Sequence, residues 1–168
     1  MLVKSIVLVG PMGVGKSTIG RLLASALQRD FYDTDKLIED RAGADISWIF
    51  DIEGEDGFRV RESNTLAELC MQDDLVIATG GGIIMREENR KLLNKYGHVV
   101  YLTASVNQLV RRTDKDKKRP LLQVDDPKQK IIELLELRDP LYREVADFVI
   151  ETDGKTPKQV AETLVEQV

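Results

Sequence analysis

The feature that most constrains this chain is a glycine-rich loop at residues 10–17, GPMGVGKS, which matches the pattern G-x-x-x-x-G-K-[ST]. The β-branched run at 6–9 before it predicts a buried strand, and apolar residues at helical spacing over 19–27 predict an amphipathic helix after it. Between such a strand and helix, successive backbone N–H groups point at phosphate oxygens, and the positive end of the helix adds to the attraction. The loop therefore predicts nucleoside triphosphate binding.

Residues of this loop have separate tasks in holding phosphates. Lys16 supplies a positive charge for the β- and γ-phosphates, which makes it a candidate catalytic residue as well as a binding one. The hydroxyl of Ser17 is a candidate ligand for Mg²⁺. The other nucleotide contacts expected in this segment are Gly13, Val14, Gly15 and Thr18.

Short apolar runs alternate with helical patterns along the rest of the chain, which is typical of a parallel sheet covered by helices. Further strands are predicted at 31–32, 75–78, 99–102 and 148–150. Helices are predicted at 34–42, 45–70 (in two or more pieces), 86–95, 105–113, 127–139 and 157–167. The length of 168 residues suits a single α/β domain, residues 1–168.

Two segments depart from plain alternation of strand and helix. Residues 36–70 carry more helix than a simple crossover needs, so we expect them to form a subdomain beside the sheet. Residues 114–126 are polar, charge-dense and bounded by prolines, and loops of this length in compact domains are usually functional. The second segment is therefore predicted to be a mobile loop.

Charge and composition exclude several classes of protein. With 24 Lys and Arg against 29 Asp and Glu, the net charge of −5 disfavours a nucleic-acid binder, since any phosphate must be held by a local site. No run approaches the roughly 18 apolar residues of a membrane span. One cysteine, Cys70, cannot form an internal disulfide and favours a reducing compartment. We expect a cytoplasmic monomer that binds small molecules, without nucleic-acid or membrane partners.

Five further motifs follow the loop in the sequence. They are Tyr32-Asp33-Thr34-Asp35, Gly57-Phe58-Arg59 with Glu62, Thr79-Gly80-Gly81-Gly82, Arg119-Pro120-Leu121-Leu122, and Arg138-Asp139-Pro140-Leu141-Tyr142 with Glu144 and Ala146. Many proteins share the phosphate loop, whereas the other five together are specific. In this order, the six motifs resemble those of the shikimate kinase family, most closely its bacterial type I members.

The resemblance implies a P-loop NTPase fold like that of nucleoside monophosphate kinases, with a five-stranded parallel sheet in the order 2-3-1-4-5 flanked by helices. It implies that residues 36–70 form a small helical substrate-binding subdomain and that residues 112–126 form a lid. The implied reaction is ATP-dependent phosphorylation of the 3-hydroxyl of shikimate to shikimate 3-phosphate, on the route to chorismate and the aromatic amino acids. Mg²⁺ is the implied cofactor, with ATP as co-substrate.

The resemblance also assigns residues to the acceptor side. Arg59 and Arg138 are similar to the arginines that grip the shikimate carboxylate, where two guanidinium groups give planar, bidentate recognition. Asp35 is similar to the aspartate that hydrogen-bonds the reacting hydroxyl, and it either accepts that proton or orients the nucleophile. Gly81 is similar to the glycine whose backbone N–H contacts the substrate.

On the nucleotide side, Asp33 is similar to the residue that holds Mg²⁺ through water, alongside Ser17. The alternative for Asp33 is a helix N-cap, and the two roles are compatible. Arg119 is similar to the lid cation that contacts the phosphates and acts in catalysis. Arg112 is similar to the arginine that stacks on adenine, and Lys155 falls near the position where the adenine pocket closes.

Two alternative functions share the phosphate loop. One is a kinase for another small hydroxylated metabolite, such as gluconate, and the other is a non-catalytic ATP-binding regulatory module. The pair Arg59 and Arg138 with Asp35 favours an anionic polyol of matching size over gluconate. The presence of Asp35, Ser17 and Arg119 together favours phosphoryl transfer over simple binding.

Overall fold

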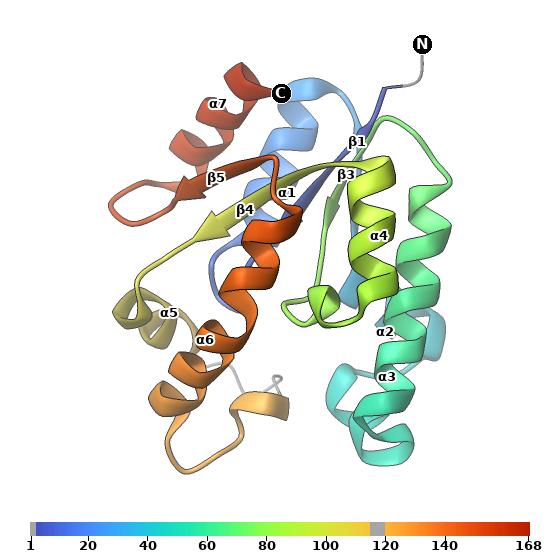
Figure 1. Cartoon of the computed structure of the whole chain (residues 1–168), viewed down its shortest axis with the longest axis vertical. Coiled ribbons are helices and arrows are strands. Elements are labelled where there is room, and N and C mark those ends of the chain that lie inside the picture. The colour runs from blue at the N-terminus through green and yellow to red at the C-terminus, as the bar shows by residue number, and fades with distance from the viewer. Residues whose placement is uncertain (1–2, 115–119) are drawn as a thin grey trace.

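A five-stranded parallel sheet forms the centre of the structure, a computed structural model in which residues 3–114 and 120–168 are described (Figure 1). The strand order is β2-β3-β1-β4-β5, and every neighbouring pair is parallel. The strands are β1 (Ser5–Val9), β2 (Asp30–Asp33), β3 (Leu75–Ala78), β4 (Gly97–Thr103) and β5 (Phe148–Glu151). The predicted strand order and the parallel α/β class are confirmed.

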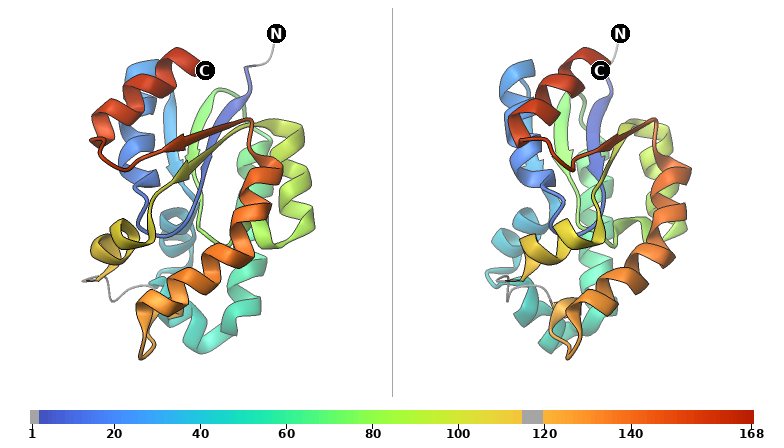
Figure 2. Two further views of the ribbon diagram at one scale, coloured as in Figure 1. Left: turned by 60° about the vertical axis from the view of Figure 1, so that its left-hand side comes forward. Right: turned by 90° about the vertical axis from the view of Figure 1, so that its left-hand side faces the viewer.

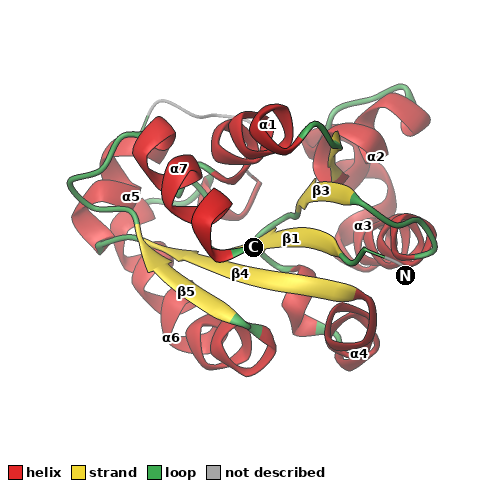
Figure 3. Cartoon of the chain, turned by 90° about the horizontal axis from the view of Figure 1, so that it is seen from above, coloured by secondary structure: helices red, strands yellow, loops and turns green. Residues whose placement is uncertain are grey.

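Helices cover both faces of the sheet. Their bounds are α1 (Lys16–Leu27), α2 (Thr34–Ala42), α3 (Ile46–Cys70), α4 (Glu87–Tyr96), α5 (Val106–Thr113), α6 (Pro127–Val145) and α7 (Pro157–Gln167), with short 3₁₀ helices η1 (Ile83–Met85) and η2 (Pro120–Leu122). Helices α1 and α7 lie together on one face, and α4 and α6 lie on the other (Figure 3). Within the described ranges, no helix has both the length and the apolarity needed to cross a bilayer.

Alternation along the central strand β1 divides the core into two layers. Ile6 and Leu8 pack with apolar residues of α1 and α7, whereas Val7 and Val9 pack with residues of α3, α4 and α6. Because both faces of β1 are covered, all five of its residues are buried. This explains why the strand reads as a continuous apolar run rather than an alternating one.

The carboxyl ends of three strands bring the predicted site residues to one edge of the sheet. β1 leads into the phosphate loop and α1, β2 leads into Asp33 and α2, and β3 leads into the glycines at 80–82. This edge faces away from the end of the molecule where both termini lie (Figure 2). In open parallel sheets, ligands bind outside the carboxyl ends of the strands, at the point where the strand order reverses.

Two helices, α2 and α3, occupy most of the segment between β2 and β3. Helix α3 is interrupted at Gly54, whose φ of 75° and ψ of 174° are not helical, so the predicted division of residues 45–70 into pieces is confirmed. Ile38, Ile49 and Phe58 form a small apolar cluster that packs α2 on α3. This packing places the second half of α3 beside the carboxyl edge of the sheet.

Helix α6 differs from its prediction, which ended the helix at residue 139. The helix continues through Pro140 to Val145. Proline inside a helix costs about 3 kcal/mol because it removes a hydrogen bond and crowds the preceding turn. However, Tyr142 and Val145 are buried against the sheet, and such side chains contribute about 1.5–3 kcal/mol each. Their burial offsets the proline, and the predicted helix end is wrong.

Candidate active site

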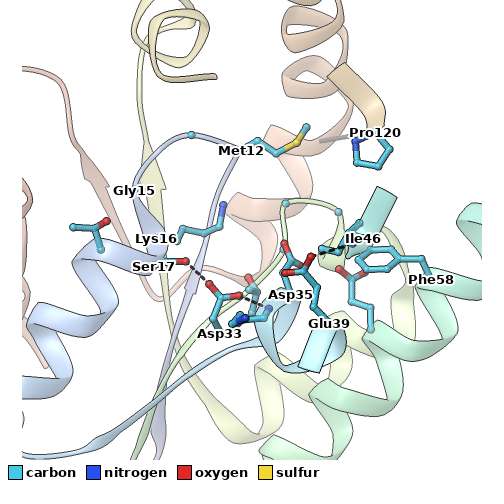
Figure 4. Close-up of a pocket in the computed structure, with 18 of the residues that line it drawn as sticks. Met12, Gly15, Lys16, Ser17, Asp33, Asp35, Glu39, Ile46, Phe58 and Pro120 are labelled. Carbon is cyan, nitrogen blue, oxygen red and sulfur yellow. Dashed lines mark hydrogen bonds between the residues drawn. The ribbon is translucent and has the colours of Figure 1, made fainter. Parts of the chain in front are cut away.

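A cavity of about 560 Å³ lies at the carboxyl ends of β1, β2 and β3 (Figure 4). Its volume is typical of a small-molecule site. The predicted site residues that line it are Gly13, Gly15, Lys16, Ser17, Thr18, Asp33, Asp35, Arg59, Gly81, Arg112 and Arg138. One space thus contains both the phosphate loop and the residues predicted for the acceptor.

The phosphate loop curls around the start of α1. Gly13 and Gly15 have φ values of 83° and 103°, a left-handed backbone that a β-carbon disfavours, so both positions favour glycine. The Lys16 ammonium donates to the carbonyl oxygens of Gly10 at 2.6 Å and Pro11 at 2.8 Å. These bonds hold a positive charge beside the N-terminus of α1, where the helix dipole is also positive. The loop therefore favours anionic phosphate oxygens.

Ser17 and Asp33 place two oxygen-bearing side chains next to each other in the cavity wall. The Ser17 hydroxyl donates to Oδ2 of Asp33, and Oδ1 of Asp33 accepts from the backbone N–H of Lys36 at 3.2 Å (Figure 4). Asp33 thus caps α2 and also faces the cavity, so the N-cap role does not prevent it from holding a metal ion. A hydroxyl and a carboxylate are hard oxygen ligands of the kind that Mg²⁺ prefers. No cluster of three or more His, Cys, Asp or Glu suited to a metal occurs among the described residues.

Two carboxyl groups lie over the loop that follows β3. A β-carbon placed on Gly80 would be 2.7 Å from Oδ1 of Asp35 and 2.8 Å from Oε2 of Glu62, so both oxygens lie against this glycine. Glu62 is buried, and its pKa is raised from 4.5 to about 7, mainly because burial disfavours the charged form. The charge of Asp35 also raises this pKa, whereas the charge of Arg59 lowers it. Glu62 therefore keeps its proton more readily than an exposed glutamate.

The two predicted carboxylate-binding arginines have different surroundings. Arg59 on α3 donates from Nη1 to Oε1 of Glu62 at 2.9 Å and from Nη2 to Oε1 of Glu55 at 3.3 Å. Burial lowers the pKa of Arg59, but these two carboxylates raise it above its usual value overall. Arg138 on α6 is only 5% exposed, and within the described part of the chain its Nε has no hydrogen-bond partner. Both side chains reach the cavity, and Arg138 lies near the charge of Glu62 and the hydroxyl of Tyr142.

Comparison with known proteins identifies this arrangement. A family model described as shikimate kinase matches residues 12–168. The chain is 56% identical over 164 residues to a shikimate kinase from Pseudomonas paraeruginosa (strain DSM 24068 / PA7), covering 98% of this chain and 95% of the relative. The chain belongs to the shikimate kinase family. A second relative, from Pseudomonas savastanoi pv. phaseolicola (strain 1448A / Race 6), is 60% identical over 157 residues, with 94% and 91% covered.

Solved structures of shikimate kinases have the same fold. "Shikimate kinase from Acinetobacter baumannii in complex with shikimate" superimposes with a TM-score of 0.96 at 50% identity, covering 98% of this chain and 92% of that one. A shikimate kinase structure from Bacteroides thetaiotaomicron gives 0.89 at 34% identity, with 99% and 98% covered. The family resemblance carried by the six motifs and the fold it implied are confirmed.

Only some of the residues predicted for the adenine side of the site line the cavity. Arg112 lines the cavity and donates from Nη1 to the carbonyl oxygen of Val14 at 2.9 Å. Val14 itself is fully buried, so its side chain is part of the core. Lys155 is exposed in the loop before α7 and does not line the cavity. Arg119, the predicted lid cation, lies outside the described residues.

Several residues of the cavity wall had no assigned role before the structure. Glu62 is one, although it lies three residues after Arg59 on a helix, a spacing that indicates an ion pair. Phe50 is another, because an apolar residue in a short helix by itself predicts only packing. Phe50 does pack on Phe58, with ring centroids 5.0 Å apart, and both rings line the cavity. Apolar rings beside charged groups suit an acceptor with a hydrocarbon ring.

The raised pKa of Glu62 predicts a pH-dependent stability. Between about pH 4.5 and pH 7, the folded protein binds a proton that the unfolded chain releases, so the free energy of unfolding should fall as the pH rises. Urea unfolding at several pH values would measure this slope in the wild type and in Glu62→Gln, where it should flatten. Glu55→Gln, at an exposed partner of the same arginine, is the control. Equal slopes in the wild type and Glu62→Gln would contradict the assignment.

Proposed function

We propose that this chain transfers the γ-phosphoryl group of ATP to the 3-hydroxyl of shikimate, making shikimate 3-phosphate on the route to chorismate and the aromatic amino acids. The observation that carries the proposal is the single cavity in which the phosphate loop lies beside Asp35, Arg59 and Arg138. Membership of the shikimate kinase family supports it, as does the Acinetobacter baumannii relative described in complex with shikimate.

The donor end of the site is the phosphate loop. Its backbone N–H groups and Lys16 hold the β- and γ-phosphates of ATP, and Thr18 supplies a further hydroxyl at the start of α1. Ser17 and Asp33 are the residues that we propose would hold Mg²⁺. A Mg²⁺ ion held there would supply positive charge against the negative charge that develops on the phosphates during transfer.

The acceptor end is the space between α3, α6 and the glycine loop. Arg59 and Arg138 provide two guanidinium forks for the shikimate carboxylate, and planar forks match a carboxylate better than ammonium groups do. The backbone N–H of Gly81 is a further proposed donor to the substrate. Phe50 and Phe58 cover the hydrocarbon part of the ring. These groups recognise an anionic, compact polyol rather than an open-chain sugar acid.

Asp35 is the proposed catalytic partner of the reacting hydroxyl. The hydroxyl oxygen forms a bond to the γ-phosphorus, the bond from that phosphorus to the β,γ-bridging oxygen breaks, and ADP leaves. The proton of the hydroxyl passes to Asp35 or to solvent. Since phosphoryl transfer depends mainly on alignment and charge stabilisation, the position of Asp35 at the start of α2 matters in either case.

The division of labour along the chain is also a proposal. Residues 36–70 act as the substrate-binding segment, which is supported by the placement of Arg59 in the cavity wall. Residues 112–126 act as the lid, supported by Pro120, which lines the same cavity. We assign Arg119 of this lid to the phosphates and Lys155 to the adenine side, as the family motifs imply.

We further propose that the enzyme works as a cytoplasmic monomer with ATP and shikimate as its partners. One cavity of one chain contains residues for both substrates, so no second subunit is needed to complete the site. Sedimentation of the purified protein with and without both substrates would report its oligomeric state.

The decisive experiment measures ADP release with three acceptor conditions. Shikimate should stimulate turnover, whereas gluconate and buffer without acceptor should not. Stimulation by gluconate alone would favour the alternative metabolite kinase. ATP binding with no acceptor-dependent turnover would favour the regulatory module.

Arg59→Ala tests the acceptor site within the same assay. A hydrogen bond to a charged group is worth about 1.5–3 kcal/mol, so KM for shikimate should rise by about 10–10²-fold while KM for ATP changes little. Arg61→Ala is a matched control, because Arg61 lies on the same helix but pairs with Glu53 at the surface. An equal rise in both variants, or an unchanged KM in Arg59→Ala, would argue against this role.

A further inference from the structure

Each glycine of the triplet 80–82 lies against a different side chain of the acceptor site. A β-carbon on Gly82 would be 2.5 Å from Nη2 and 2.6 Å from Nη1 of Arg59. On Gly80 it would meet the carboxyl groups of Asp35 and Glu62 at less than 3 Å, and on Gly81 it would be 3.3 Å from Nη1 of Arg138. The triplet is therefore a surface on which the proposed substrate-binding groups rest.

The backbone of the triplet does not itself require glycine. The positive φ angles recorded for glycines in the described chain lie elsewhere, and φ of Gly82 is −93°. Alanine can adopt such a conformation without strain. What glycine provides here is space, and that space is filled by the chain's own side chains.

At Gly82, the nearest atoms that an added methyl group would meet belong to the end of the long Arg59 side chain, whereas at Gly80 they belong to the carboxyl groups of Asp35 and the buried Glu62. The end of Arg59 can move without disturbing the sheet or the helices. Gly82→Ala is therefore expected to leave the fold intact while it displaces Arg59. This separates an effect on substrate geometry from an effect on folding.

Three buried side chains hold the glycine loop in place. The backbone N–H of Gly80 donates to Oγ1 of Thr34 at 3.1 Å, and Nδ2 of Asn89 donates to the carbonyl oxygen of Ile83 at 2.9 Å. Between them, the Tyr142 hydroxyl donates to the carbonyl oxygen of Gly81.

Tyr142 links this loop to α6. It is fully buried one helical turn after Arg138, and burial raises its pKa to about 12, so the hydroxyl keeps its proton and remains a donor. Its hydrogen bond to Gly81 therefore ties the glycine loop to the helix that carries one of the two proposed carboxylate-binding arginines, and Tyr142 also contacts Arg138 itself. Movement of the loop relative to α6 would change the spacing of both arginines.

We propose that Gly80, Gly82 and Tyr142 are positioning residues for the acceptor: the glycines set where Asp35 and Arg59 lie, and Tyr142 fixes their loop relative to Arg138. This inference rests on the proposed function. The inference adds to the proposed substrate contact of the Gly81 backbone. Gly80 and Gly82 do not contact the substrate in this proposal but determine where side chains from α2 and α3 lie.

Gly82→Ala is the first test. Displacement of a guanidinium by about 1 Å can cost up to 10²-fold, so KM for shikimate should rise about tenfold or more. KM for ATP and the melting temperature should stay close to those of the wild type. If Gly82 were needed only for folding, both of these quantities would change.

A double-mutant cycle tells whether Gly82 acts through Arg59. If it does, adding Gly82→Ala to Arg59→Ala should raise KM for shikimate no further, because the displaced group is already gone. Additive effects of the two substitutions would overturn the assignment of Gly82.

Tyr142→Phe tests the anchor independently of any change at the glycines. KM for shikimate should rise several-fold with KM for ATP unchanged. The control is Tyr101→Phe, since the Tyr101 ring stacks on Tyr142 with centroids 4.8 Å apart while its hydroxyl bonds Asp139, away from the loop. Equal effects of the two substitutions would overturn the role of Tyr142. A wild type without shikimate-dependent turnover would refute the proposed function as well, so the two failures are distinct.

Discussion

Asp35→Asn is expected to lower kcat with shikimate by about 10²–10⁴-fold, the usual contribution of a positioned acid–base group. Asparagine keeps a hydrogen-bond acceptor of the same size, but it cannot take a proton and has no negative charge. Asp35 lines the cavity together with the two arginines, whereas nucleotide binding depends on the phosphate loop. The Kd for ATP should therefore change little.

Coupled measurement of ADP release would give kcat, and calorimetry would give the Kd for ATP. Asp40→Asn is the matched control, since Asp40 lies on the same helix and pairs with Lys36 at the surface. A full rate in Asp35→Asn would show that orientation by an acceptor atom is sufficient and that no proton transfer to this residue is needed.

Arg138→Ala should raise KM for shikimate by about 10²–10³-fold, more than any other substitution in the acceptor site. Loss of one partner of a buried charge pair costs about 2–5 kcal/mol, and each 1.4 kcal/mol is tenfold. Arg59 shares its charge with Glu55 and Glu62, whereas the buried Nε of Arg138 has no partner among the described residues. The substrate carboxylate should therefore depend more strongly on Arg138.

Steady-state kinetics with shikimate and ATP varied in turn would measure this effect. Arg143→Ala controls for loss of a cation from the same helix, because Arg143 pairs with Asp139 at the surface. Arg138→Lys separates charge from shape, and the lysine variant should recover only part of the affinity because it lacks the planar fork. Full recovery by lysine would mean that charge alone binds the carboxylate.

Much of this fold was predictable because its signals are local. The phosphate loop combines a buried strand, positive-φ glycines and a helix start within about a dozen residues, so its geometry follows from adjacent chain chemistry. The interruption of α3 is another local signal, at a glycine whose backbone is not helical. The family motifs then supplied the strand order, which local patterns do not encode.

Other features depended on contacts between distant segments. A proline inside α6 predicts a helix end, yet burial of Tyr142 and Val145 against the sheet carries the helix six residues further than predicted. Phe50 becomes part of the cavity wall only because the helices α2 and α3 close beside the sheet. Neither the end of α6 nor the place of Phe50 in the cavity wall can be predicted from residue periodicity or spacing.

The glycine triplet illustrates both what the sequence determines and what only the tertiary structure determines. Its residues and their place after a strand are legible in the chain, and they predict a turn with room for close approach. The occupants of that room, Asp35, Arg59 and Arg138, come from three other elements. Hydrogen bonding and backbone conformation act between neighbours and can be read along the chain, whereas steric fit and burial act between segments that meet only after folding. The motifs of the family identify the candidate catalytic groups in the sequence, whereas the spacing and the protonation of these groups depend on the tertiary structure.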